Sequence, residues 1–452
     1  MEVFSLMISK IETNYKEHKY FYTESNIEFT KQMTNDEFNL IIVYPDIQYQ
    51  SIIGFGGAFT EAAGYALSAL SEPLQQNLLN DYFSSDGIGY TFCRTPINSC
   101  DFALDNYSYM DTTDISTFTI EHDFKYIIPM IKKSLHINPN IKLIASPWSP
   151  PAFMKDNNNM NNGGKLLNTY KQLWADYLVK YVQAYMQENI MISYMTIQNE
   201  PNAIQPWESC NYTATEEASL LQHYLAPTFK FHNIPMKFLV WDQNKERILY
   251  RINEMYKDKQ ISNFIYGIAY HYYTGDHFNN IALAKQLCPE LTLIHTEGCT
   301  GYSKHTTKSE IKNAEIYAHD IIGDLNHGSS GYIDWNLVLD YYGGPNHKKN
   351  FCNAPIMTNK KKNGYYHTLS YYYIGHFSKF IKPNAKRIAY SSYTSQLEIT
   401  SFQNPDNSIV VVVFNPNNYT VPYLLNINNN ILEDKIKKHS IITYTINQRK
   451  DK

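Results

Sequence analysis

The sequence predicts an α/β protein: a (β/α)8 TIM barrel with an attached all-β sandwich domain built from the N- and C-terminal segments. Two observations support this. Between residues 51 and 380, short apolar runs alternate with amphipathic segments eight times, whereas beyond residue 381 only strand-like runs remain. We therefore expect residues 51–380 to form the barrel and residues 1–50 plus 381–452 to form the side domain.

The barrel elements follow in order along the chain. Its expected strands are Ile52–Phe55, Tyr90–Arg94, Lys142–Ser146, Tyr194–Asn199, Lys237–Trp241, Tyr266–Tyr270, Leu291–Thr296 and Gly331–Trp335. Between the third and fourth, aromatic and aliphatic residues recur at three- and four-residue spacing from Tyr170 to Tyr185, which predicts a helix packed against the sheet. Thr215 and Ser309, each followed by glutamate, are expected to begin two later helices.

The side domain is predicted from strand-like runs at both ends of the chain. Phe38–Val43 precedes the barrel, and the runs that follow it are separated by turns rich in Asn, Pro and Asp. These later runs are Gln396–Ser401, Ser408–Phe414, Val421–Ile427 and His439–Ile446. Because both ends of the chain contribute, the side domain should pack closely against the barrel, without a flexible linker between them.

Composition narrows the class of protein. Charged residues make up 18% of the chain, hydrophobic residues 43%, and the net charge is −4, which is typical of a globular protein and favours neither nucleic acid nor anionic membranes as partners. No apolar run approaches the roughly 18 residues of a transmembrane segment. Residues Met1–Lys10 lack the features of a signal peptide, so a cytoplasmic location is expected, or secretion if a leader has been removed.

The six cysteines show no C-x-x-C pair and no spacing typical of zinc sites. We therefore expect reduced, mostly buried thiols, no metal and no cofactor.

Two glutamates are the candidate catalytic pair. Glu200 and Glu297 follow the fourth and seventh expected strands, and a barrel brings the carboxyl ends of its strands together. Hydrolysis of a glycosidic bond needs one carboxyl as acid and another as nucleophile or base; retention of configuration places them roughly 5–5.5 Å apart. An ordinary strand-end glutamate explains either residue alone, but two matching strand ends are harder to explain by accident.

The neighbours of these glutamates suit this chemistry. Pro201 favours an extended backbone at Glu200, and Gly298 permits a sharp turn after Glu297. Asn199 can hydrogen-bond a sugar hydroxyl.

The chain resembles glycoside hydrolase family 30, most closely its glucosylceramidase branch. The resemblance covers nearly the whole chain and is carried by Gly54-Phe-Gly-Gly-Ala-Phe-Thr-Glu-Ala-Ala, Tyr82-Phe with Gly87-Ile-Gly-Tyr, Arg94-Thr-Pro-Ile-Asn-Ser-Cys-Asp-Phe, Ala145-Ser-Pro-Trp-Ser-Pro-Pro, Gln198-Asn-Glu-Pro, Asp334-Trp-Asn-Leu, Gly343-Gly-Pro-Asn and Gly375-His-Phe-Ser-Lys-Phe. It implies that Glu200 is the acid/base and Glu297 the nucleophile, in agreement with the interpretation from the residues alone.

The resemblance also implies a set of sugar-binding residues. It places Arg94 in support of the carboxylates and puts around the first sugar Glu61, Trp148, Asn199, His271, Tyr273, Trp335 and Asn346. Taken singly, the two tryptophans would more often be core residues, His271 a buried histidine with satisfied hydrogen bonds, and Arg94 part of a structural ion pair. Tyr272 and His347 stand where the family pattern has tryptophan.

The leading hypothesis is a retaining β-glycosidase that hydrolyses β-glucosides, with a carbohydrate or glycolipid such as glucosylceramide as substrate. A β-xylosidase or β-1,6-glucanase of the same family would use the same machinery. A non-catalytic carbohydrate-binding barrel is the alternative from a different class. A metal-dependent hydrolase is the weakest candidate, because the chain has no H-E-x-x-H motif or comparable ligand cluster.

Overall fold

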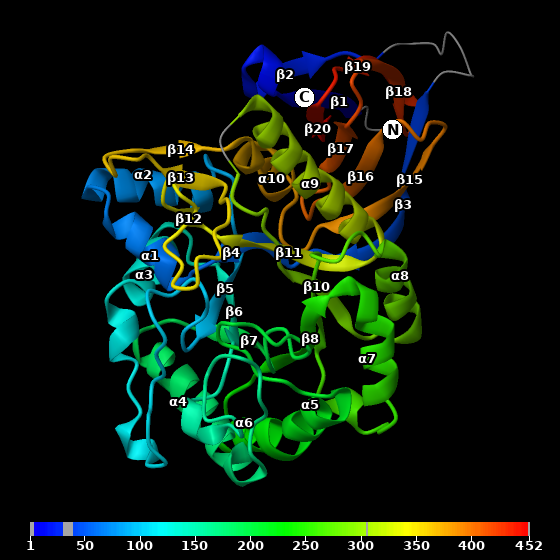
Figure 1. Ribbon diagram of the computed structural model, residues 1–452. Coiled ribbons are helices and arrows are strands. Elements are labelled where there is room, and N and C mark those ends of the chain that lie inside the picture. Colours follow the sequence, from blue (N-terminus) through cyan, green and yellow to red (C-terminus); the bar gives the residue numbers. More distant parts are fainter. Residues whose placement is uncertain (1–3, 30–38, 304–305, 451–452) are drawn as a thin grey trace.

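The computed structural model describes residues 4–29, 39–303 and 306–450, and it confirms the predicted barrel and side domain (Figure 1). Eight parallel strands close in the order β10-β11-β4-β5-β6-β7-β8-β9. Their bounds are β4 (Gly54–Ala58), β5 (Phe92–Ile97), β6 (Lys142–Pro147), β7 (Ile192–Thr196), β8 (Lys237–Asn244), β9 (Gly267–His271), β10 (Thr292–Glu297) and β11 (Ser329–Asn336). Each corresponds to one of the eight strands expected from the sequence.

Helices surround the barrel. They are α1 (Glu61–Ser68), α2 (Glu72–Phe83), α3 (Ile127–Ile137), α4 (Lys171–Gln187), α5 (Ala214–Leu220), α6 (Ala226–Phe231), α7 (Ile248–Met255), α8 (Phe278–Leu287), α9 (Thr307–Asn326) and α10 (Leu369–Ser378). On α4, the residues Trp174, Tyr177, Tyr181 and Tyr185 are fully buried, which confirms the predicted core stripe. No helix of the described residues is long and apolar enough to cross a membrane.

Two helix starts differ from the sequence prediction. Thr213, and not Thr215, caps α5: its hydroxyl accepts from the backbone N–H of Glu216, whose carboxylate accepts from the N–H of Thr213. Thr306 likewise caps α9, and Ser309 is its third residue. In both cases the hydroxyl that begins the helix lies earlier in the chain, because a capping box needs its partner side chain three residues later.

The side domain is one sheet with the strand order β19-β18-β3-β15-β16-β17-β20-β1-β2. Its strands are β1 (Phe4–Asn14), β2 (Lys19–Ile27), β3 (Leu40–Ser51), β15 (Lys386–Ser392), β16 (Glu398–Gln403), β17 (Ile409–Asn415), β18 (Val421–Ile427), β19 (Asn430–Ile436) and β20 (Ser440–Lys450). The strand expected at Phe38–Val43 is β3, although Phe38 lies outside the described residues. One apolar core joins Ile8 of β1 to Leu425 of β18, so the sheet curls over itself into a sandwich.

The two domains pack directly against each other. On α10, His376 is fully buried and hydrogen-bonds the hydroxyls of Thr13 (2.9 Å) and Thr443 (2.8 Å), which lie on β1 and β20. A small sheet of β12 (Val338–Leu339), β13 (Ile356–Thr358) and β14 (Tyr365–His367) precedes α10.

Candidate active site

A cleft of about 370 Å³ opens at the carboxyl ends of the barrel strands. It is lined by both candidate glutamates and by four of the other predicted residues, namely Trp148, Asn199, Tyr273 and Trp335. Arg94, His271 and Asn346 lie behind the cleft wall, where they contact residues that line it.

Glu297, the last residue of β10, is held by two donors. Arg94 donates from one guanidinium nitrogen to Oε2 of Glu297 at 2.7 Å, and the Tyr273 hydroxyl donates to Oε1 at 2.8 Å. The Arg94 side chain is fully buried and that of Glu297 is 9% exposed, so this ion pair is shielded from solvent. Both carboxylate oxygens are therefore fixed in direction at the cleft wall.

Glu200 lies beyond the end of β7 with its side chain 15% exposed. Its φ is +47°, in the left-handed region, so the extended backbone expected before Pro201 is wrong. Its N–H donates to the carbonyl of Asp242 at 3.0 Å, and its carbonyl accepts from the N–H of Ala203 at 2.9 Å. These bonds hold a conformation that is costly for a non-glycine residue, and such conformations gather at functional sites.

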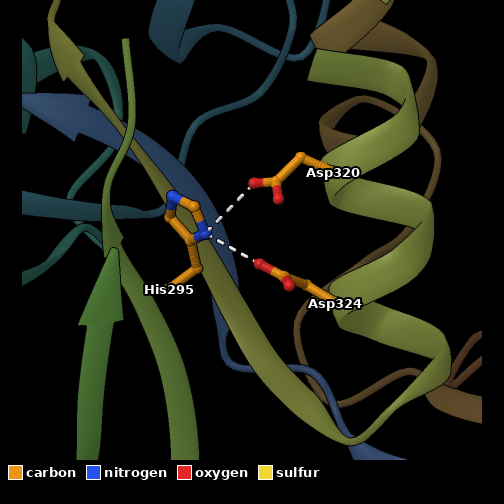
Figure 2. A group of neighbouring side chains, drawn as sticks. All are labelled: His295, Asp320 and Asp324. Carbon is orange, nitrogen blue, oxygen red and sulfur yellow. Dashed lines mark hydrogen bonds and ion pairs between the residues drawn. The ribbon is translucent and has the colours of Figure 1, made fainter. Parts of the chain in front are cut away.

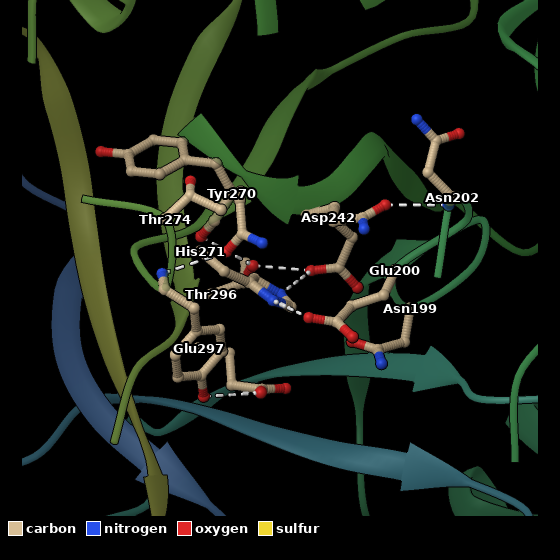
Figure 3. Close-up of polar contacts among 12 residues, drawn as sticks. Asn199, Glu200, Asn202, Asp242, Tyr270, His271, Thr274, Thr296 and Glu297 are labelled. Carbon is tan, nitrogen blue, oxygen red and sulfur yellow. Dashed lines mark hydrogen bonds and ion pairs between the residues drawn. The ribbon is translucent and has the colours of Figure 1, made fainter. Parts of the chain in front are cut away.

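Asp242, at the end of β8, is the main residue that sequence analysis missed. Its carboxylate accepts from Arg94 at 2.7 Å. It also accepts from the Thr296 hydroxyl (2.6 Å) and lies 3.1 Å from Nε2 of His271 (Figure 3). Burial favours the neutral acid, but the Arg94 charge and the contacts of His271 and Thr296 outweigh it and hold the pKa of Asp242 well below its usual range. The signal in the sequence was available, since Asp242 directly follows the expected strand Lys237–Trp241, just as Glu200 and Glu297 follow theirs.

His271 links Asp242 to Glu200. Its Nδ1 lies 3.3 Å from Oε1 of Glu200, and its ring is fully buried (Figure 3). Burial opposes a charge on the ring, but the neighbouring Glu297, Asp242 and Glu200 carboxylates raise the pKa of His271 to about 9. At neutral pH the ring is therefore an imidazolium, placed between Asp242 and Glu200.

Two stacked tryptophans form the apolar part of the wall. The rings of Trp148 and Trp335 lie 5.2 Å apart at 22°, and Phe102 packs edge-on against Trp335. The Arg94 guanidinium lies 4.7 Å from the Trp148 ring, which adds a cation–π contact. Flat aromatic walls of this kind suit the C–H faces of a sugar.

The structure does not bring Glu61 to the cleft. At the start of α1, its carboxylate accepts from the N–H of Leu104 (2.9 Å) and contacts His122 (2.8 Å). Asp101, and not Glu61, lines the cleft, and its carboxyl group accepts a hydrogen bond from the Asn346 side chain at 3.2 Å. Asp101 lies in a segment that carries the family resemblance, but it is not among the site residues predicted from the sequence.

Asp101 is an unusual carboxyl. Burial, together with the charges of Glu297 and Glu208, raises its pKa to about 8, although hydrogen bonds from Asn350 and Asn346 oppose the shift. Near neutral pH it is therefore a protonated acid that can donate a hydrogen bond into the cleft.

All six cysteines are free and buried, as the sequence predicts. Cys299 and Cys352 line the cleft with their sulfurs 3.2 Å apart.

One group of side chains outside the cleft has the composition of a metal site. Nδ1 of His295 lies 2.7 Å from Asp324 and 3.4 Å from Asp320, both on α9 (Figure 2). However, the buried ammonium of Lys245 lies 2.5 Å from Asp320 and 2.9 Å from Asp324. Burial opposes its charge, but the two aspartates raise the pKa of Lys245, so a protein cation already balances these carboxylates.

Comparison with known proteins agrees with this geometry. Residues 52–381 match the glycosyl hydrolase family 30 TIM-barrel domain, and residues 384–444 match the beta sandwich domain of that family. The lysosomal acid glucosylceramidase of Mus musculus is 33% identical over 85% of this chain and 78% of its own. An endo-1,6-beta-D-glucanase of Aspergillus fumigatus is 27% identical over 81% of this chain and 78% of its own.

Solved structures are similar over nearly the whole chain. SrfJ from Salmonella typhimurium superposes with a TM-score of 0.94 at 35% identity, over 97% of this chain and 99% of its own. An endo-beta1,6-glucanase superposes with a TM-score of 0.88 at 28% identity, over 97% of this chain and 98% of its own. The chain belongs to glycoside hydrolase family 30.

Proposed function

We propose that this protein hydrolyses β-glucosides with retention of configuration, with Glu297 as nucleophile and Glu200 as acid/base, and that its substrate resembles glucosylceramide. The observation that carries the proposal is that both glutamates reach one cleft and contact the same buried group of Arg94, Asp242 and His271.

The charges of this group suit a double displacement. Arg94 and the His271 imidazolium supply two positive charges, and Asp242 and Glu297 supply two negative charges, so the group is neutral when Glu200 is protonated. Once Glu297 forms the glycosyl ester and Glu200 has given its proton to the leaving oxygen, the second negative charge lies on Glu200. The group is neutral in both halves of the reaction, which avoids an uncompensated buried charge.

Other groups are placed to bind the sugar. Arg94 donates to Oδ1 of Asn199 at 2.9 Å, which leaves the Asn199 NH2 group as a donor at the cleft. Asp101 adds a second donor, and the Trp148–Trp335 pair adds an apolar wall. Hydrogen bonds of this kind that strengthen in the transition state contribute several kcal/mol.

Azide rescue tests the two roles separately. On an aryl β-glucoside, Glu297→Ala and Glu200→Ala should both lose most activity. Azide replacing the nucleophile should give the α-glucosyl azide with Glu297→Ala, whereas azide attacking the glycosyl ester should give the β-glucosyl azide with Glu200→Ala. Glu433→Gln, an exposed carboxylate on β19, is the matched control and should retain wild-type activity. Wild-type rates in Glu297→Ala would refute the proposal. Binding of the aryl β-glucoside by the wild-type protein without any hydrolysis would refute it too.

A β-1,6-glucanase is the second candidate, and the outer cleft supports it. The cleft is also lined by Trp207 and by the amide side chains of Gln205, Gln243 and Asn244. Amide groups can hydrogen-bond the hydroxyls of a second sugar, and the indole can contact its C–H face. A panel of glucosylceramide, aryl β-glucoside, aryl β-xyloside and β-1,6-linked gluco-oligosaccharides would rank the substrates. A dominant rate on the xyloside or the oligosaccharides would overturn the glucosylceramide assignment.

A further inference from the structure

A second cavity, of about 900 Å³, lies at the end of the barrel opposite the cleft. Its lining includes Lys142 and Lys237, the first residues of β6 and β8, whereas Glu297 is the last residue of β10 and Glu200 lies beyond the end of β7. The sandwich supplies the other wall, through Gln48 of β3 and Arg387 of β15. Cavities between two domains are common places for ligands to bind.

The cavity is strongly positive. Lys142, Lys237, Lys285 and Arg387 all line it, and no aspartate or glutamate does. Among the residues that the structure describes, none of these four cations takes part in an ion pair. Like charges gathered without a counter-charge create a positive potential that attracts anions.

Aromatic rings hold two of these cations at the cavity wall. The Lys237 ammonium lies 4.9 Å and 4.8 Å from the ring centroids of Tyr194 and Tyr266, which both line the cavity. On the opposite wall, the Arg387 guanidinium lies 3.6 Å from the centroid of Tyr49. Cation–π contacts orient a cation but leave its charge unneutralised.

The hydrogen-bond acceptors of Lys285 and Arg387 are also neutral. Lys285 donates to the backbone carbonyls of Pro289 and Leu291, and Arg387 donates to the side-chain oxygen of Gln50 at 3.3 Å. Burial lowers the pKa of both Lys285 and Arg387, although the nearby carboxylate of Glu290, which does not line the cavity, opposes the shift at Lys285. Lowered pKa values show that the surroundings do not fully compensate these charges.

We propose that this cavity is a second, non-catalytic binding site, and that it takes a small anion carrying two or more phosphate groups. The cations lie on two opposite walls, so an anion that carries several negatively charged groups can contact both walls at once. Arginine binds phosphate through two parallel hydrogen bonds, and lysine binds it as a point charge. A neutral sugar would leave the cations uncompensated. The site is independent of the cleft and of the substrate proposed above.

The bound anion would bridge the barrel and the sandwich, because Lys142 and Lys237 belong to one and Arg387 to the other. A ligand that binds only the folded protein raises its melting temperature. Binding should weaken as salt increases, because added ions screen the cavity.

Calorimetric titration of the full chain with sodium tripolyphosphate tests the proposal, with thermal unfolding as the second measurement. We expect saturable binding to one site and a higher melting temperature, neither of which sodium sulfate at equal ionic strength reproduces. Lys237→Gln/Arg387→Gln should weaken binding at least about tenfold. The control Lys180→Gln/Lys361→Gln removes the same charge from exposed residues elsewhere and should bind within about twofold of wild type. Glu297→Gln should bind normally.

Three results would overturn the site: no saturable binding, equal weakening in the control double variant, or clearly tighter binding in Glu297→Gln, which removes a negative charge from the cleft and would therefore place the anion there. Should the Lys237/Arg387 double variant fail to fold, Lys142→Gln replaces it. Lys142 is only partly buried and its loss should leave the packing intact. Unchanged affinity in a folded Lys142→Gln variant would then count against the proposal.

Discussion

His271 should make the stability of the protein depend on pH. Its pKa is raised from 6.5 to about 9, so its protonation stabilises the fold fully below about pH 6.5, and this stabilisation is lost as pH rises through about 9. At about 1.4 kcal/mol per pH unit, the contribution is about 3 kcal/mol. For cooperative unfolding of 452 residues, at about 2.1 cal/mol/K per residue, this corresponds to about 3–4 °C in melting temperature.

The substitution His271→Gln removes this contribution. The variant should melt below wild type by about this amount at about pH 6, and the gap should shrink towards pH 10 as wild type loses its imidazolium. Thermal unfolding followed by circular dichroism across this range measures the gap. His136→Gln, an exposed histidine on α3, is the control and should follow wild type throughout. A gap that is the same size at pH 6 and pH 10 would contradict the assignment of an imidazolium at position 271.

Three further predictions follow from the site. Tyr273→Phe removes the 2.8 Å bond to Glu297 and should lower kcat/KM on an aryl β-glucoside about 10- to 100-fold, since such a bond to a charged group is worth about 1.5–3 kcal/mol; unchanged kinetics would contradict this. Wild-type activity should fall as pH rises through about 8, where Asp101 becomes a second anion near the nucleophile, and pH–rate profiles of Asp101→Asn should lack that fall. Lys245→Met leaves two buried aspartates of α9 without their cation and should lower the free energy of unfolding, measured by chemical denaturation, by about 3–5 kcal/mol. A chelator should leave the stability of wild type unchanged. Destabilisation by the chelator would show instead that a metal ion binds these aspartates.

The barrel was predictable because its strands are buried on both faces and therefore appear as continuous apolar runs. All eight were found this way, but β1 and β2 were not. Apolar and polar residues are mixed in these two strands, and β2 lies at the edge of the sheet. The position of β1 is set by its pairing with β20, which is distant in the sequence.

The site residues that could be predicted are those whose place in the cleft depends only on their position at the end of a strand. A carboxylate directly after a buried strand reaches the cleft, which gave Glu200 and Glu297. The left-handed backbone of Glu200 was not predictable, because it depends on its hydrogen bond to the carbonyl of Asp242, distant in sequence. The choice between Glu61 and Asp101 was not predictable either, since it depends on the fold of the loop after β5.

The pairing of β1 with β20 determines the order in which the protein can be completed during synthesis. Asn14 faces Ser440 across the two strands, so the first strand leaves the ribosome long before its neighbour exists. The barrel can close in the meantime, because all of its strands, including β4 and β11 whose pairing completes it, precede β20 in the chain. The side domain is therefore the last part to assemble, and until then the edge of β1 that will pair with β20 is open to pairing with another nascent chain.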